Sequence, residues 1–143
     1  MKFVFSSLFK KTVKKGSYLA DSTKCLSKYQ KFQIISFSKD LESLPIKSKN
    51  FFKLSTDGDI DPTDLEQILY ESDSFMKTNT NTLIIIKDIN LLLEANPFEK
   101  VLHFILNLKD LTSSKDATLI VIYNKELIQK KHLIIFSQEL KKI

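Results

Sequence analysis

The stretch that decides the fold is Thr82-Leu83-Ile84-Ile85-Ile86-Lys87-Asp88 (TLIIIKD). An unbroken run of leucine and β-branched side chains is typical of a strand buried on both faces, as the central strands of parallel sheets are. A second run of this kind extends from Ala117 to Tyr123 (ATLIVIY). The first run ends in Asp88, so the sequence predicts a carboxylate at the carboxyl end of a central strand.

Shorter apolar segments before residue 60 favour further strands, and segments with helical periodicity stand between the strands. We expect these strands at residues 17–20, 32–37 and 51–54, and helices at residues 21–30, 61–78, 96–111 and 125–142. This alternation predicts a single α/β domain over residues 16–143, a three-layer sandwich with a largely parallel sheet of about five strands.

Two proline-containing segments indicate where helices begin. In Thr56–Asp64 (TDGDIDPTD), we expect Asp61 as the N-cap, Pro62 at the first helical position and Asp64 near the positive end of the helix dipole. Asn96-Pro97-Phe98-Glu99 is interpreted in the same way. The aspartates of Thr56–Asp64 lack the glycine and glutamate spacing of a calcium-binding EF-hand, so the helix start is preferred over a metal site.

The residue inventory excludes several kinds of catalytic and cofactor site. Only two glycines occur, Gly16 and Gly58, so neither a Walker A loop nor a dinucleotide-binding fingerprint can be assembled. Cys25, the one cysteine, can form neither an internal disulfide nor a zinc site, which favours a reducing cytoplasm. His103 and His132 have no acidic partner at motif spacing. We expect no catalytic residue, no metal and no required cofactor.

The first fifteen residues, MKFVFSSLFKKTVKK, carry five lysines and no acid, which accounts for the whole net charge of +5. The remaining lysines equal the 17 acids in number, and the chain has no arginine. The apolar side chains of the segment fall on one helical face, as in a basic amphipathic helix. The candidates for membrane or partner contact are Lys2, Phe5, Phe9, Lys10, Lys11, Lys14 and Lys15. Docking on the domain itself or on a partner subunit is preferred over membrane binding, and nucleic-acid binding is not expected.

The segment from Gly16 to Leu140 resembles an archaeal family of uncharacterised domains that is often appended to PAS-type sensor proteins. The matching segments are Gly16–Leu19, Ile60–Glu66, Phe98–Leu111 and Ala117–Val121, of which Ile60–Glu66 (IDPTDLE) is the most specific. This resemblance implies a role in signalling and names no established activity.

A more distant resemblance is to the RecA/KaiC-type ATPase core, in which a first strand leads into the phosphate loop and a later apolar strand ends in an aspartate that helps hold Mg²⁺. Tyr18–Ala20 is similar to the first strand and Leu83–Asp88 to the later one. The residues after the first strand, Asp21-Ser22-Thr23-Lys24, lack glycine and place a carboxylate where phosphate would bind. The resemblance therefore implies an ATPase scaffold without its nucleotide loop. Its weak candidates for cofactor contact are Ser22, Thr23, Lys24 and Asp88.

These observations favour a non-catalytic signalling or protein-interaction domain in the cytoplasm, with a second copy of itself or a sensor protein as partner. Two alternatives stay open. One is a regulatory protein with residual nucleotide binding, and the other is peripheral attachment to a membrane through residues 1–15.

Overall fold

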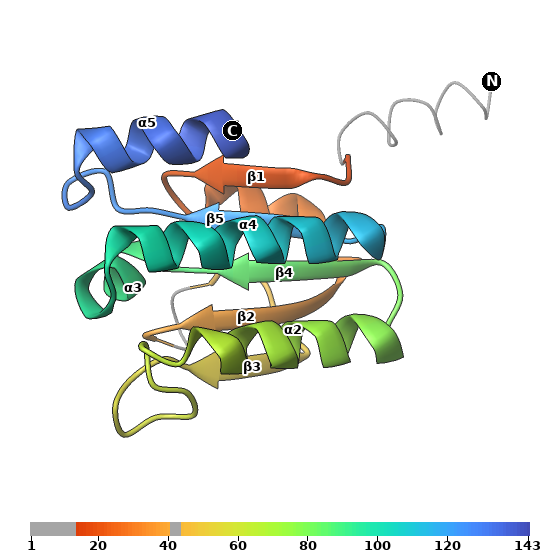
Figure 1. The fold of residues 1–143 in the computed structure, drawn as a ribbon. Helices are drawn as coiled ribbons and strands as arrows, with labels where there is room; N and C mark the ends of the chain where they lie inside the picture. The colour runs from red at the N-terminus through yellow and green to blue at the C-terminus, as the bar shows by residue number, and fades with distance from the viewer. Residues whose placement is uncertain (1–13, 41–43) are drawn as a thin grey trace.

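The computed structural model describes residues 14–40 and 44–143, which form an open sheet of six parallel strands in the order β3-β2-β4-β5-β1-β6 (Figure 1). The strands are β1 (Ser17–Ala20), β2 (Gln33–Ser38), β3 (Asn50–Lys53), β4 (Thr82–Ile86), β5 (Thr118–Ile122) and β6 (Lys141–Lys142). The α/β class and the parallel sheet are confirmed. The expected strand count of about five was too low, because the chain adds β6 after its last helix.

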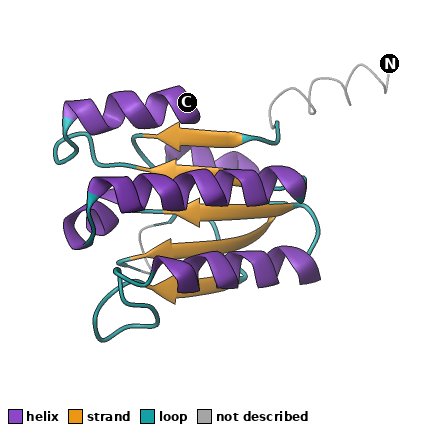
Figure 2. Cartoon of the chain, in the orientation of Figure 1, coloured by secondary structure: helices purple, strands orange, loops and turns teal. Residues whose placement is uncertain are grey.

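Helices cover the two faces of the sheet unequally (Figure 2). The elements are the 3-10 helix η1 (Lys24–Tyr29) and the α-helices α2 (Leu65–Thr78), α3 (Ile89–Ala95), α4 (Phe98–Ser114) and α5 (Lys130–Glu139). The four α-helices share one hydrophobic cluster with one face of the sheet, whereas η1 and the segment around Ile46 pack on the other face. In the described residues, no helix is both long and apolar enough to cross a bilayer.

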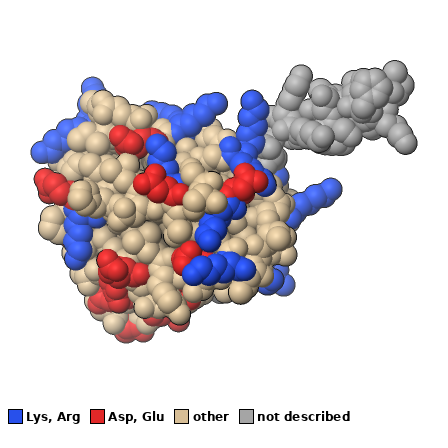
Figure 3. Space-filling model, turned by 45° about the vertical axis from the view of Figure 1, so that its right-hand side comes forward, with Lys and Arg blue, Asp and Glu red and all other residues tan. Residues whose placement is uncertain are grey.

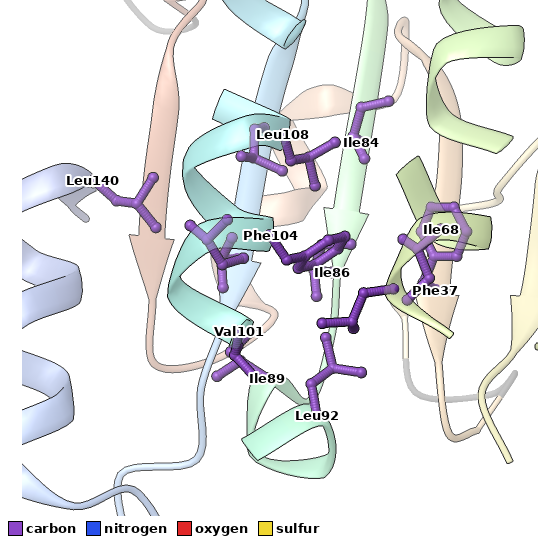
Figure 4. Close-up of a cluster of buried hydrophobic side chains, with 14 of the residues drawn as sticks. Phe37, Ile68, Ile84, Ile86, Ile89, Leu92, Val101, Phe104, Leu108 and Leu140 are labelled. Atoms are coloured by element: carbon purple, nitrogen blue, oxygen red, sulfur yellow. The ribbon is translucent and has the colours of Figure 1, made fainter. Parts of the chain in front are cut away.

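β4 is the centre of the core, as its sequence predicts, and all five of its residues are buried. Ile84 and Ile86 point into the larger cluster, where Figure 4 shows them against Phe104 and Leu108 of α4. Leu83, which alternates with them, faces the smaller cluster on the opposite side. Each fully buried aliphatic or aromatic side chain contributes about 1.5–3 kcal/mol, so the two-sided burial of β4 fixes the middle of the sheet.

The predicted helix start at Asp61 was wrong by three residues. α2 begins after Asp64, whose carboxylate accepts a hydrogen bond from the backbone N–H of Gln67 at 3.2 Å. Asp61 instead closes a preceding turn, in which its carboxylate accepts from the backbone N–H of Thr63 at 2.9 Å. Pro62 is buried in this turn, and Asn96 donates a hydrogen bond to its carbonyl oxygen, so the tertiary contact holds Pro62 outside the helix.

The predicted cap at Asn96 was also wrong. The side chain of Asn96 donates to the carbonyl oxygens of Leu92 and Pro62, both at 2.9 Å, so it closes α3 and ties that helix to the turn before α2. Pro97 occupies the N-cap position of α4, without a side-chain hydrogen bond. A sequence pattern alone does not distinguish these roles, because asparagine suits both ends of a helix.

The expected helices at the two ends of the domain differ from the structure as well. Residues 21–23 form a turn, and the short helix η1 that follows is of the 3-10 type. At the other end, α5 is limited to ten residues, and the two lysines expected in its last turn form β6. β6 pairs with β1, and the backbone N–H of Ile143 donates to the carbonyl of Leu19 at 2.9 Å.

Candidate functional site

A polar cavity of about 290 Å³ lies at the carboxyl ends of β1, β4 and β5. The chain leaves β1 toward η1 on one face of the sheet and leaves β5 toward α5 on the other, so the two loops diverge here. Such a crevice is the usual ligand position in open parallel α/β sheets. The cavity is lined by Asp21, Ser22, Thr23, Lys87, Asp88, Ile122, Tyr123, Asn124, Lys125 and Glu126.

Asp88 lies at this cavity directly after β4. Its φ of 63° is in the left-handed region, which costs a non-glycine residue about 1–2 kcal/mol but is better tolerated by aspartate than by most residues. Its backbone carbonyl accepts a hydrogen bond from Leu91 at 2.8 Å, so the backbone turns sharply into α3. The Asp88 carboxylate pairs with the ammonium group of Lys87 at 3.2 Å. The ammonium group of Lys87 therefore compensates much of the negative charge with which Asp88 would hold a metal ion.

The β1 side of the cavity is formed by a short turn. Asp21, Ser22 and Thr23 line it, whereas Lys24 begins η1 and lies outside the lining. The Ser22 hydroxyl accepts from the backbone N–H of Lys24 at 3.4 Å, and the Thr23 carbonyl accepts from Leu26 at 3.0 Å. Three of the four candidates for cofactor contact, Ser22, Thr23 and Asp88, therefore meet at one cavity. The fourth, Lys24, does not.

The sequence reasoning missed the β5 side of the cavity, Tyr123 to Glu126. The buried side chain of Asn90 in α3 accepts a hydrogen bond from the backbone N–H of Asn124 at 2.9 Å. The side chain of Asn124 in turn accepts from the backbone N–H of Glu126 at 2.9 Å. The available signal was the polar run after the apolar segment Ala117–Tyr123, because the carboxyl ends of parallel strands meet at one edge.

The charge of the cavity disfavours a polyphosphate. Three carboxylates line it, from Asp21, Asp88 and Glu126, against two ammonium groups, of which that of Lys87 is already paired. The lining contains neither histidine nor cysteine. In the described part of the chain, no group of three or more acidic, histidine or cysteine side chains is arranged to hold a metal ion. The lining of the cavity is therefore polar and of mixed charge, without the excess of positive charge that a polyphosphate would require.

The other residues that the sequence singled out lie apart from the cavity. Cys25 is half-buried against the smaller cluster, and burial raises the pKa of its thiol. His103 is exposed on α4, whereas His132 stacks on Phe98 with the ring centres 4.1 Å apart. Partial burial, followed by the charge of Lys131, lowers the pKa of His132.

Of the candidates for membrane or partner contact, the structure describes Lys14 and Lys15, which precede β1 at the opposite edge of the sheet from the cavity. Lys14 and Lys15 are exposed there, and Lys15 pairs with Asp116 at 2.9 Å. The other candidates, Lys2, Phe5, Phe9, Lys10 and Lys11, lie outside the described residues.

Fold and cavity together define an α/β domain with an open parallel sheet and a small polar crevice at its carboxyl edge. A family model described as a protein of unknown function (DUF835) matches residues 20–140, and the chain belongs to this family. No curated protein matches the sequence significantly.

Proposed function

We propose that this chain is a non-catalytic cytoplasmic domain that relays a signal through protein contacts, on an ATPase-type scaffold that has lost its phosphate loop. The observation that carries the proposal is the turn Asp21–Thr23 after β1. It places a carboxylate in the cavity and leads into a 3-10 helix, so backbone amides are not arrayed there as in a phosphate-binding loop.

The scaffold part of the proposal is supported by the order of the strands. β1 and β4 are separated in the sheet by β5 alone, so the turn after β1 and Asp88 line the same cavity. This is the relation expected between a phosphate loop and a Mg²⁺-holding aspartate in an ATPase core. The signalling part rests on the resemblance to archaeal domains that accompany PAS-type sensors.

Calorimetric titration of the full chain with ATP and Mg²⁺ tests the loss of nucleotide binding. We expect no binding heat, because Asp21, Asp88 and Glu126 would face the phosphates. Saturable heat that disappears in Asp88→Ala would contradict the proposal and assign the cavity to residual nucleotide binding. Residual nucleotide binding is the second candidate function, and it is favoured by the cavity because side chains do not fill this space.

Exposed apolar side chains near the C-terminus support a protein contact. Leu127 is 63% exposed, Ile134 51% and Ile143 44%, and they make up three of the four large hydrophobic residues that are exposed in the described chain. The fourth, Tyr70, lies on α2. Leu127 precedes α5, Ile134 lies on α5 and Ile143 follows β6, and an apolar surface built from these elements would suit a protein partner.

Size-exclusion chromatography with light scattering tests a second copy as the partner. We expect the full chain to associate and Leu127→Ser/Ile134→Ser to reduce that association, whereas Tyr70→Ser, which removes an equally exposed side chain elsewhere, should leave it unchanged. A wild-type monomer would exclude a second copy and leave a sensor protein as the partner.

A further inference from the structure

The amino ends of the parallel strands lie along one side of the sheet, which we call the amino edge. This edge carries a cluster of lysines from five separate parts of the chain. The segments at this edge are residues 14–17, 30–33, 47–50, 77–82 and 113–118, which precede strands or end helices. Their exposed lysines are Lys14, Lys15, Lys31, Lys47, Lys49, Lys77 and Lys115. The same segments contain one acid, Asp116, and the charges of Glu139 and Lys141 beside them cancel. We call these seven lysines the basic edge.

Contacts between the segments hold the basic edge together. Lys15 pairs with Asp116, and the backbone N–H of Leu119 donates to Gly16, which joins the start of β1 to the loop before β5. Lys49 donates to the side chain of Asn79 at 2.7 Å, which joins the segment before β3 to the end of α2. The segments that carry the lysines are therefore joined at one end of the molecule, although Lys14 and Lys115 are 101 residues apart in sequence.

Most of the basic edge is not neutralised by the protein itself. Among the described residues, Lys14, Lys31, Lys47 and Lys115 have no ion-pair or side-chain hydrogen-bond partner, and Lys49 contacts a neutral amide. The remaining two, Lys15 and Lys77, are paired with Asp116 and Asp73. Figure 3, with this end turned forward, shows lysine side chains projecting along the right-hand side. A cluster of like charges destabilises the folded domain unless an anionic partner compensates it.

The opposite edge of the sheet carries an acidic segment. Residues 54–66, which link β3 to the first turn of α2, contain no lysine and five acids, Asp57, Asp59, Asp61, Asp64 and Glu66. Residues 16–143 are neutral in sum, yet the fold separates their charges along the strand direction. An anionic surface would attract the basic edge and repel the acidic segment, so the domain would bind in one orientation.

We propose that the basic edge docks the domain on an anionic lipid surface. Residues 1–13, which contain three further lysines and no acid, are joined to the domain at this edge through Lys14 and Lys15. Stable membrane attachment usually needs two weak signals, for example an apolar anchor and a polybasic patch. The absence of arginine fits lipid headgroups better than nucleic acid, which is read by bidentate arginine contacts.

Co-sedimentation of the full chain with phosphatidylcholine vesicles, with and without phosphatidylserine, tests this proposal. We expect binding only to vesicles with phosphatidylserine, and we expect it to weaken as salt is raised. The variant Lys31→Glu/Lys47→Glu/Lys115→Glu leaves residues 1–15 intact and removes lysines without described partners. Its partition coefficient should fall roughly a hundredfold or more, because each lysine near such a surface contributes about fivefold.

The control Lys39→Glu/Lys125→Glu/Lys130→Glu makes the same change in net charge at the carboxyl edge. These three lysines are exposed, and the control should bind within about threefold of wild type because they lie away from the docked surface. Circular dichroism checks that both variants fold. If the charge-reversed basic-edge variant does not fold, the test uses Lys→Gln substitutions at Lys31, Lys47 and Lys115 in its place. Three results would each overturn the proposal. They are an equal loss of vesicle binding in both triple variants, unchanged vesicle binding in the basic-edge variant, and no vesicle binding by wild type. Tighter binding to single-stranded RNA than to the vesicles at the same salt would assign the edge to nucleic acid instead.

Discussion

The two ends of the parallel sheet use their polar side chains in different ways. At the carboxyl end, Asn96, Asn90 and Asp64 all bond to backbone groups of the protein, so their polar atoms hold loops and helix ends in place. At the amino end, Lys31 and Lys47 project into solvent without a described partner. The difference teaches that these carboxyl-end side chains hold loops and helix ends, whereas at the amino end lysines such as Lys31 and Lys47 keep their charge available for a partner even though other contacts join the segments there.

The largest effect is expected from Asn96→Ala. This change removes the donor to two buried carbonyl oxygens, those of Pro62 and Leu92, and should lower the free energy of unfolding by about 2–3 kcal/mol. Urea unfolding followed by circular dichroism measures it. Asn107→Ala, an exposed asparagine on α4, is the matched control and should cost no more than about 0.5 kcal/mol. Equal effects would mean that Asn96 does not fasten the carboxyl end.

Asp64→Ala should have the next largest effect, a loss of about 1 kcal/mol, because α2 would lose its side-chain N-cap. Asp64→Ser keeps an oxygen that can accept the same backbone hydrogen bond, and most of the stability should return in the same urea experiment. If the serine variant is as unstable as the alanine variant, the cap does not account for the contribution of Asp64.

Acid should weaken the carboxyl end through Asp61. The backbone N–H of Thr63, followed by its hydroxyl, lowers the pKa of the Asp61 carboxyl. A lowered pKa stabilises the folded state above the carboxyl pKa of the unfolded chain, and this contribution is lost as pH falls through the folded value. NMR titration of the Asp61 side chain should give a pKa below the ordinary value, and Thr63→Val should raise it by removing the hydroxyl. An unchanged pKa in Thr63→Val would contradict this cause.

The smallest effect is expected at the amino end, from the pair between Lys15 and Asp116. Both side chains are solvated, with 41% and 82% of their area exposed. Such pairs contribute at most about 1 kcal/mol and weaken with salt. A double-mutant cycle with Lys15→Gln and Asp116→Asn measures the coupling, and asparagine tolerates the positive φ at position 116. A coupling above about 1 kcal/mol that persists at high salt would show that this pair fastens the amino end more firmly than a solvated ion pair can.

The central strands were predictable because each carries its own signal. The apolar runs of β4 and β5 require burial on both faces whatever surrounds them, and one of them places Asp88 at the carboxyl edge. β6 was not predictable in the same way, since two lysines carry no strand signal and become a strand only because β1 offers an unpaired edge. The cap at Asp64 was missed for a related reason, namely that the contact between Asn96 and Pro62 joins residues 34 positions apart.

For the candidate site, the sequence indicated Ser22, Thr23 and Asp88, and the strand order brought them to one cavity. Asn124 and Glu126 joined them only through the pairing of β5 between β4 and β1. Residue spacing along the chain contains no information about which strands become neighbours in a sheet.

The sequence by itself determined the alternation of strands and helices and the burial of the central strands, because these depend on nearby residues. It also determined the lack of a glycine-rich phosphate loop and the net charge of zero from Gly16 onward, because these depend on residue counts. Only the tertiary structure decided where the charges lie. Lysines that precede strands or end helices collect at the amino edge, and aspartates that precede α2 collect at the carboxyl edge, because all six strands point the same way. Residues 16–143, which are neutral in sum, therefore fold into a domain with a cluster of lysines at one end and a group of aspartates at the other.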